Sequence, residues 1–266
     1  MQISVRDRMM GLAGSILRPF IYLVLTLPAV IVVVTSFTAG TTLNFPPEGF
    51  SLRWYRAALS SDVFMPALWM SLKLACLTMV LAVAIGMCAS FVLDRCEFRG
   101  KALFRTLTLS PLIIPMVVIG LGLLQFMAWI GWTQSLSRLV AGHILITIPY
   151  VVRTVSASLV LLDRNLEQAA MNLRARPAKV LLRITIPLLA PAMVASAVFA
   201  FVTSFGNITL SIFLGVANRT TLPVAIFTYL EQSYDPALAA ISTIVIALTV
   251  GILMLVGRLV GMEKVA

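Results

Sequence analysis

The stretch from Ala67 to Leu93 reads ALWMSLKLACLTMVLAVAIGMCASFVL and contains one charged side chain, Lys73. A helix that crosses a hydrocarbon core roughly 30 Å thick needs about 20 apolar residues, and this stretch exceeds that length. The whole chain has the same character, because 60% of its residues are hydrophobic and only 11% are charged. Soluble domains carry about a quarter charged residues. The sequence therefore predicts an all-α, polytopic membrane protein.

Five further windows of this kind flank the stretch, so we predict six transmembrane helices in a single transmembrane domain over residues 1–266. The six windows are residues 20–38, 67–93, 106–130, 139–162, 188–214 and 236–260. The first lacks an obvious small-x-small cleavage site and is expected to remain as an uncleaved span. The fourth is the least apolar, since His143, Thr147, Pro149 and Arg153 interrupt it.

The distribution of Lys and Arg predicts how the chain is oriented. Fourteen of these residues flank one side of the predicted spans and four flank the other, with Lys73 and Arg153 close to the membrane. Because cytoplasmic loops carry the excess of basic residues, both termini and the connection over residues 163–187 are expected in the cytoplasm. The cations lie in short tracts between apolar runs, which disfavours nucleic-acid binding. In the first outer connection, Trp54 and Tyr55 predict a short helix at the membrane surface.

Several functional classes lack their usual residues. All ten Asp and Glu residues lie in predicted loops or at span ends, whereas ion-coupled carriers commonly use carboxylates inside the membrane. That class remains the alternative function. A Walker-type glycine loop is missing, and Cys76, Cys88 and Cys96 have no CxxC spacing. His143 has no acidic residue nearby in sequence, and we expect it to make a hydrogen bond across the helix bundle. We predict no catalytic residue, metal site or cofactor on this chain.

The connection over residues 163–187 reads DRNLEQAAMNLRARPAKVLLRITIP and predicts two short helices. Leu166, Ala169, Ala170 and Leu173 recur at helical spacing, so a small apolar face is expected. A break follows, and Pro177 suits the first position of the second helix, where its missing N–H is harmless. Two interpretations are open: an ordinary basic loop with an incidental amphipathic turn, or a docking element through which a partner moves a span.

This connection resembles the coupling loop of importer-type ATP-binding-cassette permeases, whose pattern is Glu-Ala-Ala, three residues, Gly, nine residues and Ile-x-Leu-Pro. Gln168 stands at the Glu position with Glu167 before it, and Arg174 replaces the Gly, which tolerates a left-handed turn that Arg resists. The resemblance implies that one set of residues couples the chain to an ATPase. The set is Leu166, Glu167, Gln168, Ala169, Ala170, Leu173, Arg174, Ile184 and Pro187.

Other segments are similar to the second permease subunit of the spermidine/putrescine-type branch, among them SLRWYRAAL (residues 51–59), SPLIIP (110–115) and SFGNITLSIFL (204–214). The resemblance implies a type I importer permease in the bacterial inner membrane. Its implied partners are an ATPase dimer that carries ATP and Mg²⁺, a periplasmic binding protein, membrane lipid and a second six-span permease, either another chain or a second copy. A polyamine-like solute is implied; amino acid derivatives, aminophosphonates, iron, sulfate and thiamine remain alternatives.

The fifth window offers a candidate wall for the translocation path. Ser196, Ala200, Thr203, Asn207 and Ser211 follow one another at spacings of four, three, four and four, which places them on one helical face. Small and polar residues at this spacing also suit helix–helix packing in lipid. The predicted path residues are Thr147, Tyr150, Thr203, Ser204, Asn207, Ser211 and Tyr229.

Overall fold

The computed structural model describes residues 5–215 and 220–260. Within these ranges the regular elements are helices, and the β-type pairing consists of one isolated antiparallel bridge between Thr38 and Phe50. The predicted all-α class is therefore confirmed. The chain divides into two compact units, residues 1–65 with 228–248 and residues 66–227 with 249–266. The prediction of one domain over residues 1–266 stays a prediction.

The first unit contains α1 (Val5–Thr35), α2 (Arg53–Leu59) and parts of α11 (Leu222–Gln232) and α12 (Ala237–Val260). The predicted short outer helix is thus present as α2. The polar atoms of its aromatic residues bond to the protein itself: Trp54 Nε1 donates to the Gly40 carbonyl at 3.0 Å, and the Tyr55 hydroxyl lies 2.6 Å from Ser36 Oγ. These bonds fix α2 to the segment that follows α1.

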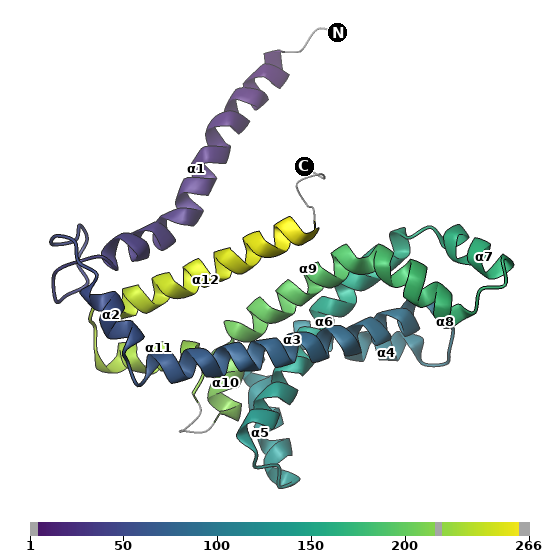
Figure 1. The fold of residues 1–266 in the computed structure, drawn as a ribbon. Coiled ribbons are helices and arrows are strands. Elements are labelled where there is room, and N and C mark those ends of the chain that lie inside the picture. Colours follow the sequence, from purple (N-terminus) through teal and green to yellow (C-terminus); the bar gives the residue numbers. More distant parts are fainter. Residues whose placement is uncertain (1–4, 216–219, 261–266) are drawn as a thin grey trace. The chain divides into compact units, whose positions relative to one another are not determined.

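The second unit contains most of α3 (Phe64–Arg95) and the elements up to α10. In chain order these elements are α4 (Lys101–Leu109), η1 (Ser110–Leu112), α5 (Met116–Trp129), α6 (Ser135–Leu161), α7 (Arg164–Asn172), α8 (Pro177–Val180), η2 (Leu181–Thr185), α9 (Ile186–Phe205) and α10 (Thr209–Leu214). Helix α6 packs along α9, as Figure 1 shows. One buried cluster joins α3, α6 and α9 around Val151, and another joins α3, α5, α6 and α10 around Leu214.

Five helices in the described part of the chain are long and apolar enough to cross a membrane. Their limits are Leu17–Thr35, Phe64–Arg95, Leu136–Leu161, Pro177–Phe205 and Ala237–Arg258. The pair Lys101–Leu112 and Met116–Trp129 passes the same test together, and its two halves meet at 107°. Counting this bent pair as one span gives six, as predicted.

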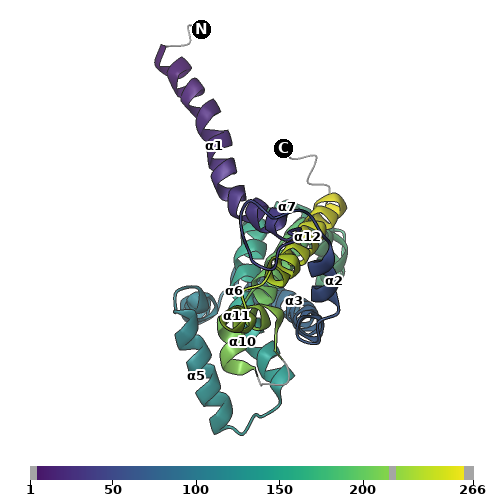
Figure 2. The ribbon, with the colours of Figure 1, turned by 90° about the vertical axis from the view of Figure 1, so that its left-hand side faces the viewer.

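The bend corrects the expectation of an uninterrupted helix over residues 106–130. Figures 1 and 2 show α5 turned away from the line of α4. The turn lies at Pro115, which caps α5 with extended backbone (ψ 133°). Proline has no N–H for a helical bond, and the residue before it is disfavoured in helical conformation. The apolar composition of residues 106–130 suits a membrane span, but the helix axis changes direction within these residues.

The fifth window, residues 188–214, also differs from the prediction. Helix α9 ends at Phe205, and the separate helix α10 begins at Thr209. Between them, Asn207 Oδ1 accepts a hydrogen bond from the Leu210 N–H at 2.8 Å. Asn side chains compete in this way for backbone donors, so the amide starts a new helix. Asn207 and Ser211 therefore lie beyond the helix that carries Ser196.

Candidate functional site

Helix α7 lies between the end of α6 and the start of α8, as the coupling-loop pattern predicts (Figure 1). Asp163 caps it, because its Oδ1 accepts a hydrogen bond from the Asn165 N–H at 2.9 Å. Short acidic side chains are preferred at this position since they satisfy one of the unpaired donors of the first turn. Because α6 ends at Leu161 and α7 begins at Arg164, the two helices are connected along the chain only by Leu162 and Asp163.

One side of α7 carries apolar side chains that the chain itself does not cover. Leu166 is 48% exposed, Leu173 is 84% exposed, and Ala169 between them is exposed as well. Ala170, which was predicted on the same face, is half-buried instead. Residues at spacings of three and four lie on one face of a helix, so Leu166, Ala169 and Leu173 form an outward stripe. We call these three residues the outward stripe of α7.

Arg174 ends α7 in the conformation that the sequence analysis expected arginine to resist. Its φ is +61°, in the left-handed region. The Arg174 N–H donates to the Met171 carbonyl at 2.9 Å, and the Ala175 N–H donates to the Ala170 carbonyl at 3.1 Å. These two bonds form the Schellman motif that normally has glycine at this position. The turn of the family pattern is thus retained without its glycine.

Replacing Arg174 with glycine is expected to stabilise this turn. A left-handed non-glycine residue costs roughly 1–2 kcal/mol, and the freedom of glycine in the unfolded chain offsets about half of that. Hydrogen exchange at the Ala175 amide should therefore slow by about threefold. Arg174→Val is the matched control, because a β-branched side chain suits this conformation least, and it should make exchange faster. Equal rates in all three proteins would contradict the expectation.

The second half of the loop leads directly into a span. Pro177 occupies the first turn of α8, as predicted, and the helix continues through η2, a π-helical segment, into α9. Pro187 has no N–H, so it removes the bond that the Arg183 carbonyl would accept in a regular α-helix. The change of register in η2 lies at this point, and π-helical turns are frequent at functional sites. Ile184 is half-buried there, and Pro187 is exposed.

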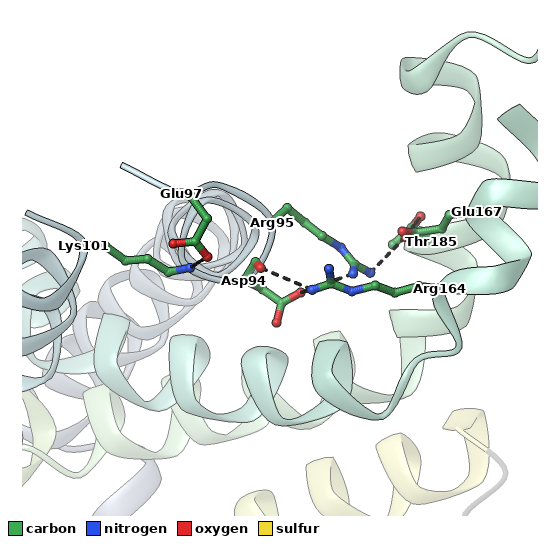
Figure 3. Close-up of polar contacts among 7 residues, drawn as sticks. All are labelled: Asp94, Arg95, Glu97, Lys101, Arg164, Glu167 and Thr185. Atoms are coloured by element: carbon green, nitrogen blue, oxygen red, sulfur yellow. Dashed lines mark hydrogen bonds and ion pairs between the residues drawn. The ribbon is translucent and has the colours of Figure 1, made fainter. Parts of the chain in front are cut away.

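Glu167 anchors α7 to two other elements (Figure 3). Its Oε1 accepts a hydrogen bond from Arg95 Nη2 at 3.1 Å and another from Thr185 Oγ1 at 2.7 Å. Arg95 is the last residue of α3, and Thr185 is the last residue of η2. We call Arg95, Glu167 and Thr185 the junction cluster.

A second ion pair adjoins the junction cluster. Arg164 Nη2 lies 3.3 Å from Asp94 Oδ2, and Asp94 Oδ2 lies 3.4 Å from Arg95 Nη1 (Figure 3). Two acidic and two basic side chains therefore alternate between the end of α3 and the first turn of α7. Sequence reasoning identified Glu167 but missed Asp94, Arg95, Arg164 and Thr185. These partners have no local signature, since about 70 residues separate α3 from α7 along the chain.

The predicted path residues separate into groups. His143 Nδ1 lies 2.9 Å from Ser204 Oγ, and its Nε2 lies 3.4 Å from Ser211 Oγ. Thr147 Oγ1 donates to the His143 carbonyl at 2.8 Å. All four of these residues are buried, so the predicted hydrogen bond across the bundle is confirmed and joins α6, α9 and α10. Satisfied polar groups of this kind stabilise helix packing in lipid.

The remaining path candidates are half-buried rather than buried, and the Asn207 carbonyl accepts a hydrogen bond from Ser211 Oγ at 2.7 Å. Tyr150, Thr203 and Asn207 are half-buried. Tyr229 belongs to the first unit, where its ring packs 5.0 Å from that of Phe64 and its hydroxyl donates to Asp235 Oδ2 at 2.7 Å. That hydrogen bond, with burial second, raises the pKa of the Tyr229 hydroxyl above its ordinary value. The role of all these residues in a path stays a prediction.

The helices and the loop define a polytopic membrane protein that presents an anchored, partly exposed amphipathic helix between two of its spans. The family comparison agrees: residues 82–261 match the model of the binding-protein-dependent transport system inner membrane component, and the chain belongs to this family. The matched residues include the whole of α7 and the partners of Glu167. The chain is therefore a permease subunit of an importer of this family.

Individual relatives point to a narrower group. The chain is 33% identical to the putrescine transport system permease protein PotI of Escherichia coli (strain K12), over 82% of this chain and 80% of that protein. It is 28% identical to the spermidine/putrescine transport system permease protein PotC of the same strain, over 92% of both chains. A crystal structure of the bacterial alginate ABC transporter, in complex with alginate pentasaccharide-bound periplasmic protein, has a TM-score of 0.73 at 14% identity, covering 97% of this chain and 96% of that chain.

Proposed function

We propose that this chain forms half of the translocation path of an ATP-driven importer for a polyamine-like solute, and that α7 docks on a separate ATPase subunit. The observation that carries the proposal is the contrast between the two sides of α7. Its outward stripe is exposed, while Glu167 ties its other side to α3 and η2. Amphipathic helices bind partner grooves through apolar residues at this spacing. The stripe is therefore the docking surface, and the anchored side transmits the movement.

The other proposed partners follow from the fold and its relatives. Within the chain residues 17–30 of α1 are exposed, which leaves their surface for lipid and a second permease. The alginate transporter that shares the fold was crystallised with a periplasmic protein, and we extend that kind of partner to this chain. ATP and Mg²⁺ belong to the ATPase subunit, so no catalytic residue is assigned here. We further propose that both termini lie in the cytoplasm of a bacterium, with the spans in its inner membrane.

The proposed substrate class rests on relatives whose printed names contain putrescine and spermidine. The spans themselves offer little to a polyamine cation. Asp94, which belongs to the α3 span, is the sole acidic residue within the described spans, and it lies at the end of that span, paired with Arg95 and Arg164. Cations bind best where carboxylates and aromatic faces are available. We therefore assign selectivity to the binding protein and passage to this chain.

Reconstitution tests the function directly. Proteoliposomes that contain this chain with the ATPase, second permease and binding protein of its system should take up radiolabelled putrescine when ATP is present. The chain alone should neither hydrolyse ATP nor accumulate putrescine under a proton or sodium gradient. Gradient-driven uptake by the chain alone would identify an ion-coupled carrier instead. If another solute stimulated the ATPase of the complex and putrescine did not, the proposed substrate class would be wrong. The proposed role as a permease would still hold.

A further inference from the structure

Helix α7 is joined to its neighbours in the chain by short segments that permit it to swing. Leu162 and Asp163 before it have extended backbone, with ψ of 126° and 111°. After it, the left-handed Arg174 leads to Arg176, which is extended as well (ψ 143°). Rotation about such residues is the usual origin of hinge motion. Side-chain contacts must therefore set the direction of α7 relative to the spans.

Among those contacts, the bonds of Glu167 are the most strongly held. The exposed side-chain fraction is 16% for Glu167 and 20% for Arg95, but 59% for Arg164 in the neighbouring pair with Asp94. Water and salt screen an exposed pair effectively, whereas a partly buried pair is screened much less. Thr185, the third member of the junction cluster, is only 1% exposed. Its hydroxyl adds a neutral donor to the same carboxylate oxygen.

The junction cluster also reaches an element that the backbone of the loop does not. Through the chain, α7 is linked to α6 on one side and to α8, η2 and α9 on the other. The bond from Glu167 to Arg95 adds α3, which ends about 70 residues earlier. A displacement of α7 thus acts on α6 through the backbone, and on α3 and the start of α9 through this carboxylate. Without Glu167, the side-chain link to α3 that remains is the more exposed pair of Arg164 with Asp94.

We propose that Glu167 is a positioning residue, which makes α7, the end of α3 and the start of α9 move as one body. The inference rests on the proposed function, in which α7 docks on the ATPase. The outward stripe receives the movement, and Glu167, on the opposite side of the helix, distributes it. Loss of Glu167 should therefore leave docking intact and weaken the transfer of movement to the spans.

Spin-label distances test this directly and need no knowledge of the substrate. In the complete complex, labels are placed at the exposed native Cys96, just after α3, and at Asn172→Cys on α7, with Cys76→Ala and Cys88→Ala as background. The parent should show one narrow distance both without nucleotide and with ATP. Glu167→Gln should give a broad distribution in both states. Thr185→Val removes one of the two bonds and should broaden the distribution less.

Two further variants test whether the broader distance distribution comes from the junction cluster or from the loss of any charged side chain. The double variant Arg95→Gln with Glu167→Gln should broaden the distribution little more than Glu167→Gln alone, because the two changes share the Arg95–Glu167 bond and the double variant loses in addition only the pair of Arg95 with Asp94. Lys101→Gln is the matched control. It breaks the pair with Glu97, whose side chain is 88% exposed, and should leave the narrow distance unchanged.

Coupling is the functional readout. The amount of putrescine taken up per ATP hydrolysed should fall about fivefold or more in Glu167→Gln, while the ATPase still co-purifies. A narrow distance with unchanged uptake per ATP would overturn the proposal. Loss of the ATPase from Glu167→Gln would overturn it too, by assigning Glu167 to the docking surface. Failure of the proposed function is distinct, since the ATPase would then be absent from the parent complex.

Discussion

Replacing Ala169 with arginine is expected to abolish co-purification of the chain with its ATPase subunit. Ala169 lies in the middle of the outward stripe, with Leu166 three residues before it and Leu173 four residues after it. An arginine there prevents close approach of a groove and places a charge in the contact. Burying an unpaired charge costs about 3–5 kcal/mol, which weakens binding by at least about a hundredfold. Tagged chain should then elute without ATPase.

The same exchange in another helix of the chain provides the control. Ala102 in the first turn of α4 is also an exposed alanine, and Ala102→Arg should retain the ATPase. Helix α7 itself should remain folded in Ala169→Arg, because residue 169 points away from Glu167 and the junction cluster. If Ala169→Arg bound the ATPase and transported normally, the outward stripe would not be the docking surface.

Replacing Gly86 with alanine is expected to destabilise the contact between α3 and α6. A Cβ atom at residue 86 would lie 2.6 Å from Cγ1 and 2.7 Å from Cβ of Val151, which is completely buried. The Val151 Cβ is fixed to the backbone of α6, so the two helices must move apart. Overpacking of this kind costs about 1–3 kcal/mol, which corresponds to a fall in melting temperature of about 2–12 °C. Thermal unfolding in one detergent measures it.

Gly122 in α5 gives a matched control for this change. A Cβ atom there would meet nothing within 4 Å, and alanine favours helix formation over glycine. Gly122→Ala should therefore melt at the same temperature as the parent or slightly higher. Adding Val151→Ala to Gly86→Ala should restore part of the loss, because it removes the nearer of the two atoms. Equal melting temperatures for Gly86→Ala and Gly122→Ala would show that α3 and α6 adapt freely.

Properties that depend on a local average were predictable from the sequence. Hydropathy placed the helices that can cross a membrane, and helical spacing placed α7, because each signal is contained within one segment. The windows themselves did not give the breaks at Pro115 and at Asn207, since an apolar window records composition and gives no direction. Both residues nevertheless carry recognisable signals, a proline without an N–H and an asparagine whose side chain accepts the Leu210 N–H of the next helix.

The contacts that hold the site together could not be predicted in the same way. Local rules argued against a left-handed Arg174, yet the bonds from Arg174 and Ala175 to the last turn of α7 offset the cost. The hydrogen bond of His143 across the bundle was expected, but its partners Ser204 and Ser211 lie more than 60 residues away. Glu167 and Arg95 are likewise paired only by the fold, so one sequence without covariation gives no sign of them.

The junction cluster and its neighbouring pair have a consequence for how the protein is made. Their two arginines, Arg95 and Arg164, are paired with carboxylates, whereas the other basic residues of the loop over residues 163–187 are exposed: Arg174, Arg176, Lys179 and Arg183. The number of Lys and Arg residues beside the spans biases the orientation in which a chain is inserted during biosynthesis, and Asp and Glu contribute little to it. All six basic residues therefore count toward orientation, but only Arg95 and Arg164 also hold α7 to the end of α3 in the folded protein.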